Sequence, residues 1–252
     1  MDLGRIALLL VAGVGAGVVG STAGLASLVS YPALLLVGLS PVTANVTNTV
    51  GLIGSSIGSV TGSRPELAGL GSLVRRRLPV AVAGGALGAL ALLLSPPGSF
   101  EKVVPFLVAL ASVLLLLSPR LRRLHHTATS ARRSDGGLGV DALILLCCVY
   151  GGYFGAAAGV MMLAVLLART DRSLPVSNAV KNLLLGVANA TAAVFFATRA
   201  SVDWTAVPPL LVGCIAGGWL GPAVVRRVPP TLLRWLVGLG GLALAARLAT
   251  VG

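Results

Sequence analysis

Four polar side chains lie along one long apolar segment, residues 174–198, and they are the residues of this chain best suited to chemistry. They are Asn178, Lys181, Asn182 and Asn189, which fall within roughly a third of a turn on a helix with 100° per residue. The opposite side of this helix carries Val, Leu, Ala and Phe. Because lipid cannot satisfy polar groups, such a stripe must face other protein or a water-filled path.

Two alternatives to a substrate path stay open for this stripe. The asparagines could serve only to bond neighbouring helices, as polar residues in membrane bundles often do. Lys181 could reach the membrane interface, since it lies only about 9 Å along the helix axis from Pro175. A path with amides, hydroxyls and one ammonium, but no carboxylate, would select for an anion and disfavour a cation.

The composition indicates a membrane protein. Of the 252 residues, 56% are hydrophobic and only 10% are charged, and the mean hydropathy is +0.96. Repeated long apolar runs predict an all-α polytopic protein of the cell membrane with multiple crossings. The net charge is +12, but the basic residues lie in short connections, which predicts contact with anionic lipid headgroups and no nucleic-acid partner.

The chain divides at a basic linker. The interpretation is a first membrane repeat over residues 1–118, a basic cytoplasmic linker over residues 119–139 and a second membrane repeat over residues 140–252. Eight apolar regions are expected: residues 3–39, 41–62, 78–94, 103–117, 140–168, 176–198, 206–225 and 231–248.

The two halves repeat each other in sequence. Three stretches of the first half recur in the same order in the second, at offsets of 135, 134 and 133: Gly17, Gly20 and Gly24 match Gly152, Gly155 and Gly159, residues 41–48 match 175–182, and residues 83–88 match 216–221. Internal duplication is typical of transporter folds, whose binding site lies at the repeat interface.

The basic residues also predict the topology. If all eight regions cross once, the 18 basic residues other than Lys181 divide 12 to 6. If the first and fifth regions turn back at their Gly-rich breaks, 14 lie inside and only Arg5, Lys102, Arg199 and Arg247 lie outside. The positive-inside rule favours the second arrangement. It gives two inverted-topology repeats, each with a broken or re-entrant first segment plus three transmembrane helices, although the first region is long enough to cross twice.

The Gly-rich breaks add a second candidate element of the site. Gly20, Gly24, Gly155 and Gly159 interrupt apolar segments, and irregular backbone at membrane depth survives only where it lines a cavity or is buried in protein. The N–H groups at a new helix start attract anions. Single glycines of this kind are more often packing notches, but the paired breaks together favour a site.

The first half carries a weaker copy of the polar stripe. On a helix over residues 41–62, Asn45 and Asn48 share a face with Ser56 and Ser59, and Leu52 interrupts that face. Two such faces related by a pseudo-two-fold axis would enclose a path near the midplane of the membrane.

These features resemble the sulfite exporter TauE/SafE family of membrane permeases. The resemblance rests on the duplicated Gly-rich segments, the Pro/Asn segments that follow them and the Asp203-Trp204 pair before a Gly-rich span, and it covers nearly the whole chain. It implies export of sulfite or organosulfonates, whereas the residues alone predict only a small anion.

The leading hypothesis is therefore a transporter of a small sulfur-containing anion, with no catalytic residues, no metal site and no cofactor. A membrane-embedded enzyme is disfavoured because both histidines lie in the linker and no acid lies inside a span. A membrane-embedded assembly subunit without transport activity is the alternative. The expected partners are the anion and the bilayer, and a homo-oligomer stays open.

Overall fold

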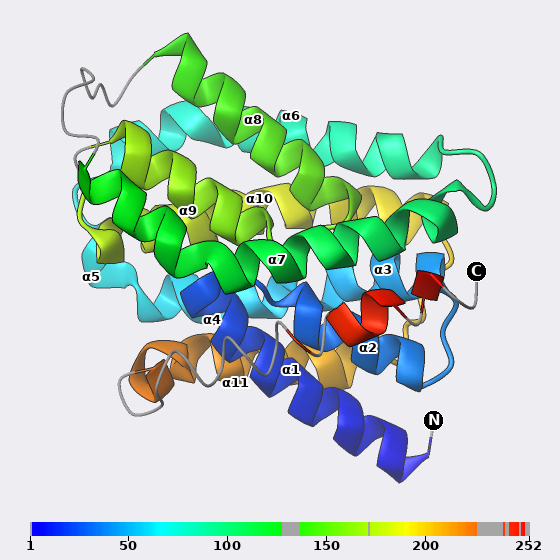
Figure 1. The fold of residues 1–252 in the computed structure, drawn as a ribbon. Helices are drawn as coiled ribbons and strands as arrows, with labels where there is room; N and C mark the ends of the chain where they lie inside the picture. The colour runs from blue at the N-terminus through cyan, green and yellow to red at the C-terminus, as the bar shows by residue number, and fades with distance from the viewer. Residues whose placement is uncertain are drawn as a thin grey trace.

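The computed structural model describes residues 2–127, 137–170, 172–225, 239, 242–246 and 248–249. Every regular element in these ranges is an α-helix (Figure 1), which confirms the predicted all-helical class for this part of the chain. The helices are α1 (Leu3–Ala23), α2 (Ser27–Leu36), α3 (Pro41–Gly51), α4 (Ile53–Gly62), α5 (Arg64–Leu67), α6 (Gly71–Leu93), α7 (Ser99–Thr127), α8 (Leu138–Tyr153), α9 (Ala158–Arg169), α10 (Leu174–Arg199) and α11 (Val207–Val225).

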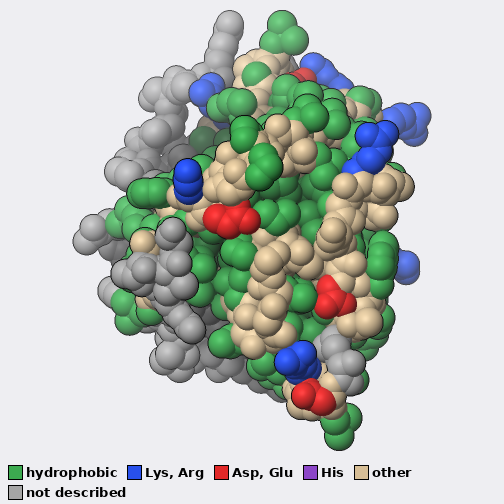
Figure 2. Space-filling view, turned by 90° about the vertical axis from the view of Figure 1, so that its right-hand side faces the viewer, with side chains coloured by type: hydrophobic (Ala, Val, Ile, Leu, Met, Phe, Trp, Pro, Cys, Tyr) green, Lys and Arg blue, Asp and Glu red, His purple; other side chains and the backbone are tan. Residues whose placement is uncertain are grey.

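Several of the described helices suit a bilayer. Three of them, α1, α6 and α10, are long and apolar enough to cross it. The helices α2, α8 and α9 and the Val207–Gly221 part of α11 are apolar but shorter. Large hydrophobic side chains are exposed on the outside, including Phe106 and Leu146. Figure 2 shows hydrophobic side chains over much of one face, with few charged residues among them.

Both Gly-rich stretches end a helix, as predicted. The first helix, α1, stops at Ala23 because Gly24 adopts a left-handed conformation, φ 76°, and turns its N–H back to the carbonyls of Val19 and Gly20. The second, α8, stops at Tyr153, and Gly155 and Ala157 both have positive φ before α9 begins. Each predicted first segment is thus a long helix followed by a shorter one.

The prediction of one continuous helix over residues 41–62 is wrong. The structure divides this stretch at Leu52 into α3 and α4. Gly51 and Gly54 flank the break, and glycine weakens a helix interior. A Cβ on Gly51 would lie 2.5 Å from the Leu210 side chain, so these glycines also let α11 approach closely.

Helix α7 extends into the predicted basic linker. Helix α7 continues through residues 118–127, where the sequence analysis placed the start of the linker, and α8 begins at Leu138. Arg and Leu favour helices, so the end of the apolar run did not end the helix. The remaining linker residues 128–136, and most of the predicted eighth apolar region, lie outside the described residues.

Matching glycines of the two halves make matching helix contacts. A Cβ on Gly17 of α1 would lie 2.5 Å from the backbone of α11, at the carbonyl of Cys214 and the amide of Gly218. Its counterpart Gly152 of α8 would lie 2.6 Å from the carbonyl of Gly85 in α6. The first helix of each half therefore packs against the other half, and Figure 1 shows the α1–α11 pair and the α6–α8 pair on opposite sides of α10. Small residues at these contacts let the backbones approach closely.

An ion-pair group ties α6 to α8. Asp141 lies 3.4 Å from Arg76 and 3.4 Å from Arg77, and the Arg77 side chain is only 2% exposed. The sequence analysis did not anticipate this group. Because a buried guanidinium needs a compensating charge, the Asp141 carboxylate stabilises the buried Arg77 side chain.

We expect Asp141→Asn to destabilise the protein by roughly 1–3 kcal/mol, less than a fully buried pair because Asp141 keeps some contact with solvent. The measurement is the apparent melting temperature of the purified protein in detergent. Arg76→Gln is the matched control, since its side chain is 61% exposed, and it should change the melting temperature little. Equal melting temperatures for all three proteins would contradict the structural role of Asp141.

Candidate functional site

Three side chains of α10 converge on the C-terminal end of α1. The Asn178 and Asn182 amides donate to the Ser21 carbonyl at 2.8 and 3.1 Å, and the Lys181 ammonium donates to the Gly20 carbonyl at 3.3 Å. The last carbonyls of a helix lack intrahelical partners and carry the negative end of its dipole. The polar side chains of α10 thus cap the C-terminal end of α1.

Lys181 is directed into the protein. The residue is 1% exposed, so its side chain does not extend to the membrane interface, which was one alternative at the level of sequence. Helix α10 begins at Leu174 after an extended Ser173, with Pro175 in its first turn, and then runs unbroken to Arg199. This regularity holds Lys181 on the same face as Asn182.

A cavity of about 50 Å³ lies beside Lys181. A water molecule needs about 10–15 Å³ measured in this way, so the cavity holds a few waters or a small ion. Seven of the ten predicted site residues line it, and Lys181 is the only charged one among the described residues of its wall. The lining consists of Gly20, Gly24, Ala26, Ser27, Leu52, Ser55, Ser56, Ser59, Gly155, Ala158, Gly159, Lys181, Asn182, Leu185 and Asn189.

The two helix breaks meet at the wall of this cavity. A Cβ on Gly24 would lie 2.5 Å from the Cα of Gly159, its counterpart in the repeat, so the two backbones touch. The short helices α2 and α9 begin just beyond, and Ser27 and Ala158, their first residues, line the cavity. Two positive helix ends thus adjoin the ammonium of Lys181, an arrangement that favours an anion.

Helix α4 contributes three hydroxyl groups. Ser56 and Ser59 belong to the polar face predicted from sequence, and both line the cavity. Ser55 was not predicted from the sequence, and neither was Ser27 on α2. The spacing of Ser55 and Ser59, four residues apart on a helix, was a usable signal.

Asn45, Asn48 and Asn178 do not line the cavity. Asn45 donates to the Tyr153 carbonyl at 2.8 Å, and Asn48 donates to Ser27 at 3.1 Å and accepts from Ser30. These asparagines therefore form hydrogen bonds to neighbouring segments. This is the role that one of the alternatives to a substrate path gave to the polar stripe. Asn45 donates to a carbonyl at the C-terminal end of α8, as Asn178 donates to a carbonyl near the C-terminal end of α1. In each half, an asparagine amide therefore caps the broken helix of the other half.

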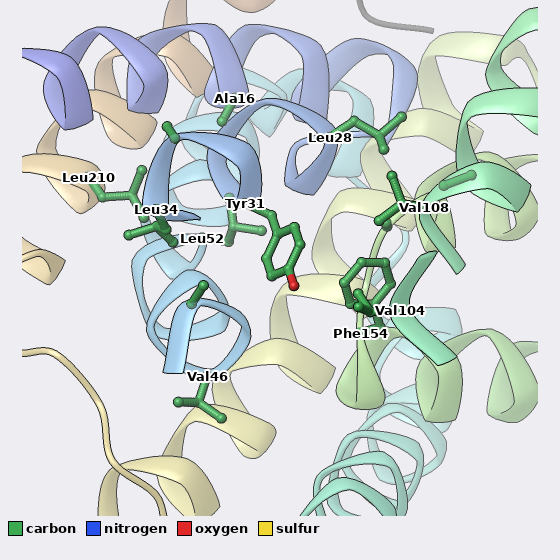
Figure 3. Close-up of a cluster of buried hydrophobic side chains, with 14 of the residues drawn as sticks. Ala16, Leu28, Tyr31, Leu34, Val46, Leu52, Val104, Val108, Phe154 and Leu210 are labelled. Carbon is green, nitrogen blue, oxygen red and sulfur yellow. The ribbon is translucent and has the colours of Figure 1, made fainter. Parts of the chain in front are cut away.

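A second, larger cavity of about 290 Å³ lies where α3, α7 and α10 come together. Its lining includes Phe100, Glu101 and Arg199. Phe100 belongs to an aromatic cluster: its ring lies 5.9 Å from that of Phe154, and the rings of Phe154 and Tyr31 are 5.4 Å apart, edge to face. Figure 3 shows Tyr31 directed toward Phe154. Phe100 lines the second cavity, and Phe154 precedes Gly155, which lines the first.

Asp203 closes the turn before α11. Its carboxylate accepts from the Thr205 hydroxyl at 2.6 Å and from the backbone N–H groups of Thr205 and Ala206. The Thr205 hydroxyl, followed by these N–H groups, lowers the pKa of Asp203. The backbone N–H of Asp203 also donates to Thr47 of α3. Asp203 thus has a structural role at this turn.

Asp203→Ala should lower the stability by about 0.5–1 kcal/mol, the low end for a lost capping group, because the side chain is largely exposed. A carboxylate with a lowered pKa stabilises the fold above its unfolded pKa of about 4, and this contribution is lost as the pH falls through the folded pKa. Melting temperatures of the two proteins should therefore differ at pH 7 and converge on acidification. A difference that persists in acid would contradict the role of the carboxylate.

Known proteins resemble this chain along nearly its whole length. The family model described as sulfite exporter TauE/SafE matches residues 9–248. The "Probable membrane transporter protein YfcA" of Escherichia coli (strain K12) is 28% identical over 238 residues, which is 92% of this chain and 85% of that protein. A "Probable membrane transporter protein" of Haemophilus influenzae is 26% identical over 246 residues, 94% of this chain and 92% of that protein. No solved structure matches. Because the family model covers both halves of the chain, including all the described residues that line the first cavity, the chain belongs to the sulfite exporter TauE/SafE family.

Proposed function

We propose that this membrane transporter carries a small sulfur-containing anion, such as sulfite or an organosulfonate, out of the cell across the cell membrane. The anion binds in the cavity beside Lys181, between the two repeats. The helix starts of α2 and α9, the serines of α4 and the amides of Asn182 and Asn189 complete the binding site.

The observation that carries this proposal is the buried ammonium of Lys181 on a polar cavity whose described lining contains no carboxylate. A buried charge is expensive unless other groups compensate it. Part of this compensation comes from the Gly20 carbonyl. A transported anion would add to this compensation while it is bound.

Inverted topology of the two repeats is part of the proposal. Gly24 and Gly159 touch at the point where the pseudo-two-fold axis would pass. The equivalent packing of α1 on α11 and of α8 on α6 supports the same relation. In that arrangement residues 1–118 and 140–252 form the two repeats, with Lys102 and Arg199 on the outer side and the second cavity as the outer vestibule.

The test is anion flux in proteoliposomes that contain the purified protein. A panel of sulfite, sulfate, thiosulfate and a sulfonate should separate the sulfur anions, with uptake well above that of protein-free vesicles for at least one of them. Comparing right-side-out with inside-out membrane vesicles gives the direction. If no oxyanion of the panel moves faster than in protein-free vesicles, transport of a sulfur anion is excluded.

An assembly subunit without transport activity is the second candidate. The observation that favours it is the bonding of Asn45, Asn48 and Asn178 to neighbouring segments. In that case the polar stripes only stabilise the bundle, and substitutions in them would lower the melting temperature without changing any flux.

A further inference from the structure

The side-chain charge of the first cavity comes from one residue. Among the described residues of the lining, Lys181 is the only one that ionises, and the others are serine, asparagine, glycine, alanine and leucine. The other ionisable side chains on the helices that pack around α10 lie off this described lining, including Tyr31, Glu66, Arg77, Asp141, Tyr150, Tyr153 and Arg169. A bound ion therefore faces a single ammonium.

The two helix breaks change this charge little. Each break contributes the positive start of a short helix, but it also contributes the end of the preceding helix, whose partial charge is negative. Gly20, near the end of α1, and Gly155, just after α8, line the cavity together with Ser27 and Ala158, the first residues of α2 and α9. Because the two kinds of helix end oppose each other, the net charge of the wall is that of the Lys181 ammonium.

Several hydrogen-bond donors of the wall are already used by the protein. The Asn182 amide donates to the Ser21 carbonyl at 3.1 Å, and the Ser59 hydroxyl donates to the Ser56 carbonyl at 3.2 Å. At the start of α2, the N–H of Leu28 is bonded within its own turn. An ion that leaves water must exchange its hydration shell for protein donors, so few donors are left to surround a doubly charged ion.

Two hydroxyl groups of the wall keep their hydrogen-bonding capacity for a ligand. Within the described residues, neither the Ser55 nor the Ser56 hydroxyl has a hydrogen-bond partner, and Ser55 is only 7% exposed. A serine hydroxyl can both donate and accept. These groups therefore suit an oxyanion that still carries a proton, whereas a fully deprotonated oxyanion can only accept.

We propose that this cavity selects monovalent anions and that sulfite binds in it as hydrogensulfite, not as the sulfite dianion. This selection rests on the proposed function and specifies the charge of its substrate. The Lys181 ammonium neutralises a monoanion, while a dianion leaves one negative charge uncompensated in a buried site. Because such a charge is costly inside a protein, we expect monoanions to be preferred at least about tenfold.

The first experiment measures sulfite uptake into proteoliposomes as a function of pH, at a constant and subsaturating total concentration. Rates in protein-free vesicles are subtracted at each pH, because uncharged sulfur dioxide crosses lipid by itself. Hydrogensulfite loses its proton near neutral pH, so the flux should fall about tenfold per pH unit on the alkaline side of that pKa. Methanesulfonate and nitrate carry one charge throughout, and their flux should stay constant. Sulfate, a dianion throughout, should move at least about tenfold more slowly than nitrate.

The second experiment adds a positive charge to the wall. Asn189 lines the cavity and is half-buried, so Asn189→Lys places a second ammonium there. It should raise the ratio of sulfate to nitrate flux at least about tenfold and weaken the fall of sulfite flux with pH. Thr198→Lys is the matched control, since Thr198 lies on the same helix but is exposed and off the described lining, and it should keep the wild-type preference. If Asn189→Lys does not fold, the anion panel and pH profile of the wild type decide.

The outcomes separate this selection from the proposed function. Sulfite flux that stays constant or rises with pH, or sulfate that moves as fast as nitrate, refutes the selection and leaves transport of a sulfur anion intact. A parallel fall of the nitrate and methanesulfonate fluxes assigns the pH dependence to the protein and refutes the selection of hydrogensulfite. Nitrate flux without flux of any sulfur anion refutes the proposed substrate and retains the preference for one charge. Flux of no anion refutes both.

Discussion

Replacing Lys181 with methionine is expected to reduce anion flux by about 10- to 150-fold. Methionine keeps the length and apolar stem of the side chain but removes the one charge on the described wall of the cavity. A hydrogen bond to a charged group contributes about 1.5–3 kcal/mol, and each 1.36 kcal/mol corresponds to a factor of ten. The measurement is the initial rate of sulfite uptake into proteoliposomes at equal protein content.

The chain offers a matched control, because its only other lysine is Lys102. Lys102 lies at the start of α7 and does not line the cavity. Lys102→Met removes the same charge from the protein and should leave the flux within about twofold of wild type, since exposed charges contribute little. Lys181→Arg should retain part of the activity, because the charge remains but the larger guanidinium takes up part of the cavity.

Melting temperatures separate a transport defect from a folding defect. Lys181 also bonds the end of α1, so Lys181→Met should lose some stability. The flux prediction is tested only on protein that elutes as a single folded species. If such Lys181→Met protein transports sulfite as fast as wild type, Lys181 does not belong to the binding site.

Replacing Gly159 with alanine is expected to cause a large loss of folded protein. A Cβ at this position would overlap with the Cα of Gly24 and would lie 2.6 Å from its carbonyl oxygen and 2.9 Å from its carbonyl carbon. All three atoms belong to the backbone, so no flexible side chain can move aside. Overpacking commonly costs 1–3 kcal/mol, and a clash between two backbones should reach about 3 kcal/mol or more.

Two other glycines serve as controls for this substitution. Gly71 begins α6 and has nothing within 4 Å of its Cβ position, so Gly71→Ala should leave the melting temperature unchanged. Gly98 also has free space but has φ 77°, so Gly98→Ala isolates the cost of a left-handed conformation, about 1 kcal/mol. Folded yield and melting temperature in detergent measure all three. Gly159→Ala protein as stable as Gly71→Ala would contradict the contact between the two breaks.

The sequence was sufficient to predict the class of the fold and seven of the residues that line the cavity. Hydropathy fixes the helical membrane character, because only helices and closed barrels satisfy their backbone in lipid. The glycine pattern located both breaks, since its spacing recurs in the two halves. Helical periodicity also placed Lys181 beside Asn182 on one polar face, and the structure keeps them together on the cavity.

Several local features could not be predicted because they depend on distant neighbours. The break at Leu52 depends on the approach of α11, and periodicity within residues 41–62 carries no information about that contact. The ion pair of Asp141 with Arg77 joins residues 64 positions apart. Phe100, Phe154 and Tyr31 meet only after α2, α7 and α8 pack together.

By itself, the sequence determined that this protein is an all-helical, internally duplicated membrane protein with a cationic polar stripe on one helix. Only the tertiary structure decided which polar residues of that stripe face the cavity and which close the ends of broken helices. The physical reason is that the helical period gives only the direction of a side chain. Whether it meets a carbonyl, as Asn178 does, or a cavity, as Asn189 does, depends on the helix packed opposite.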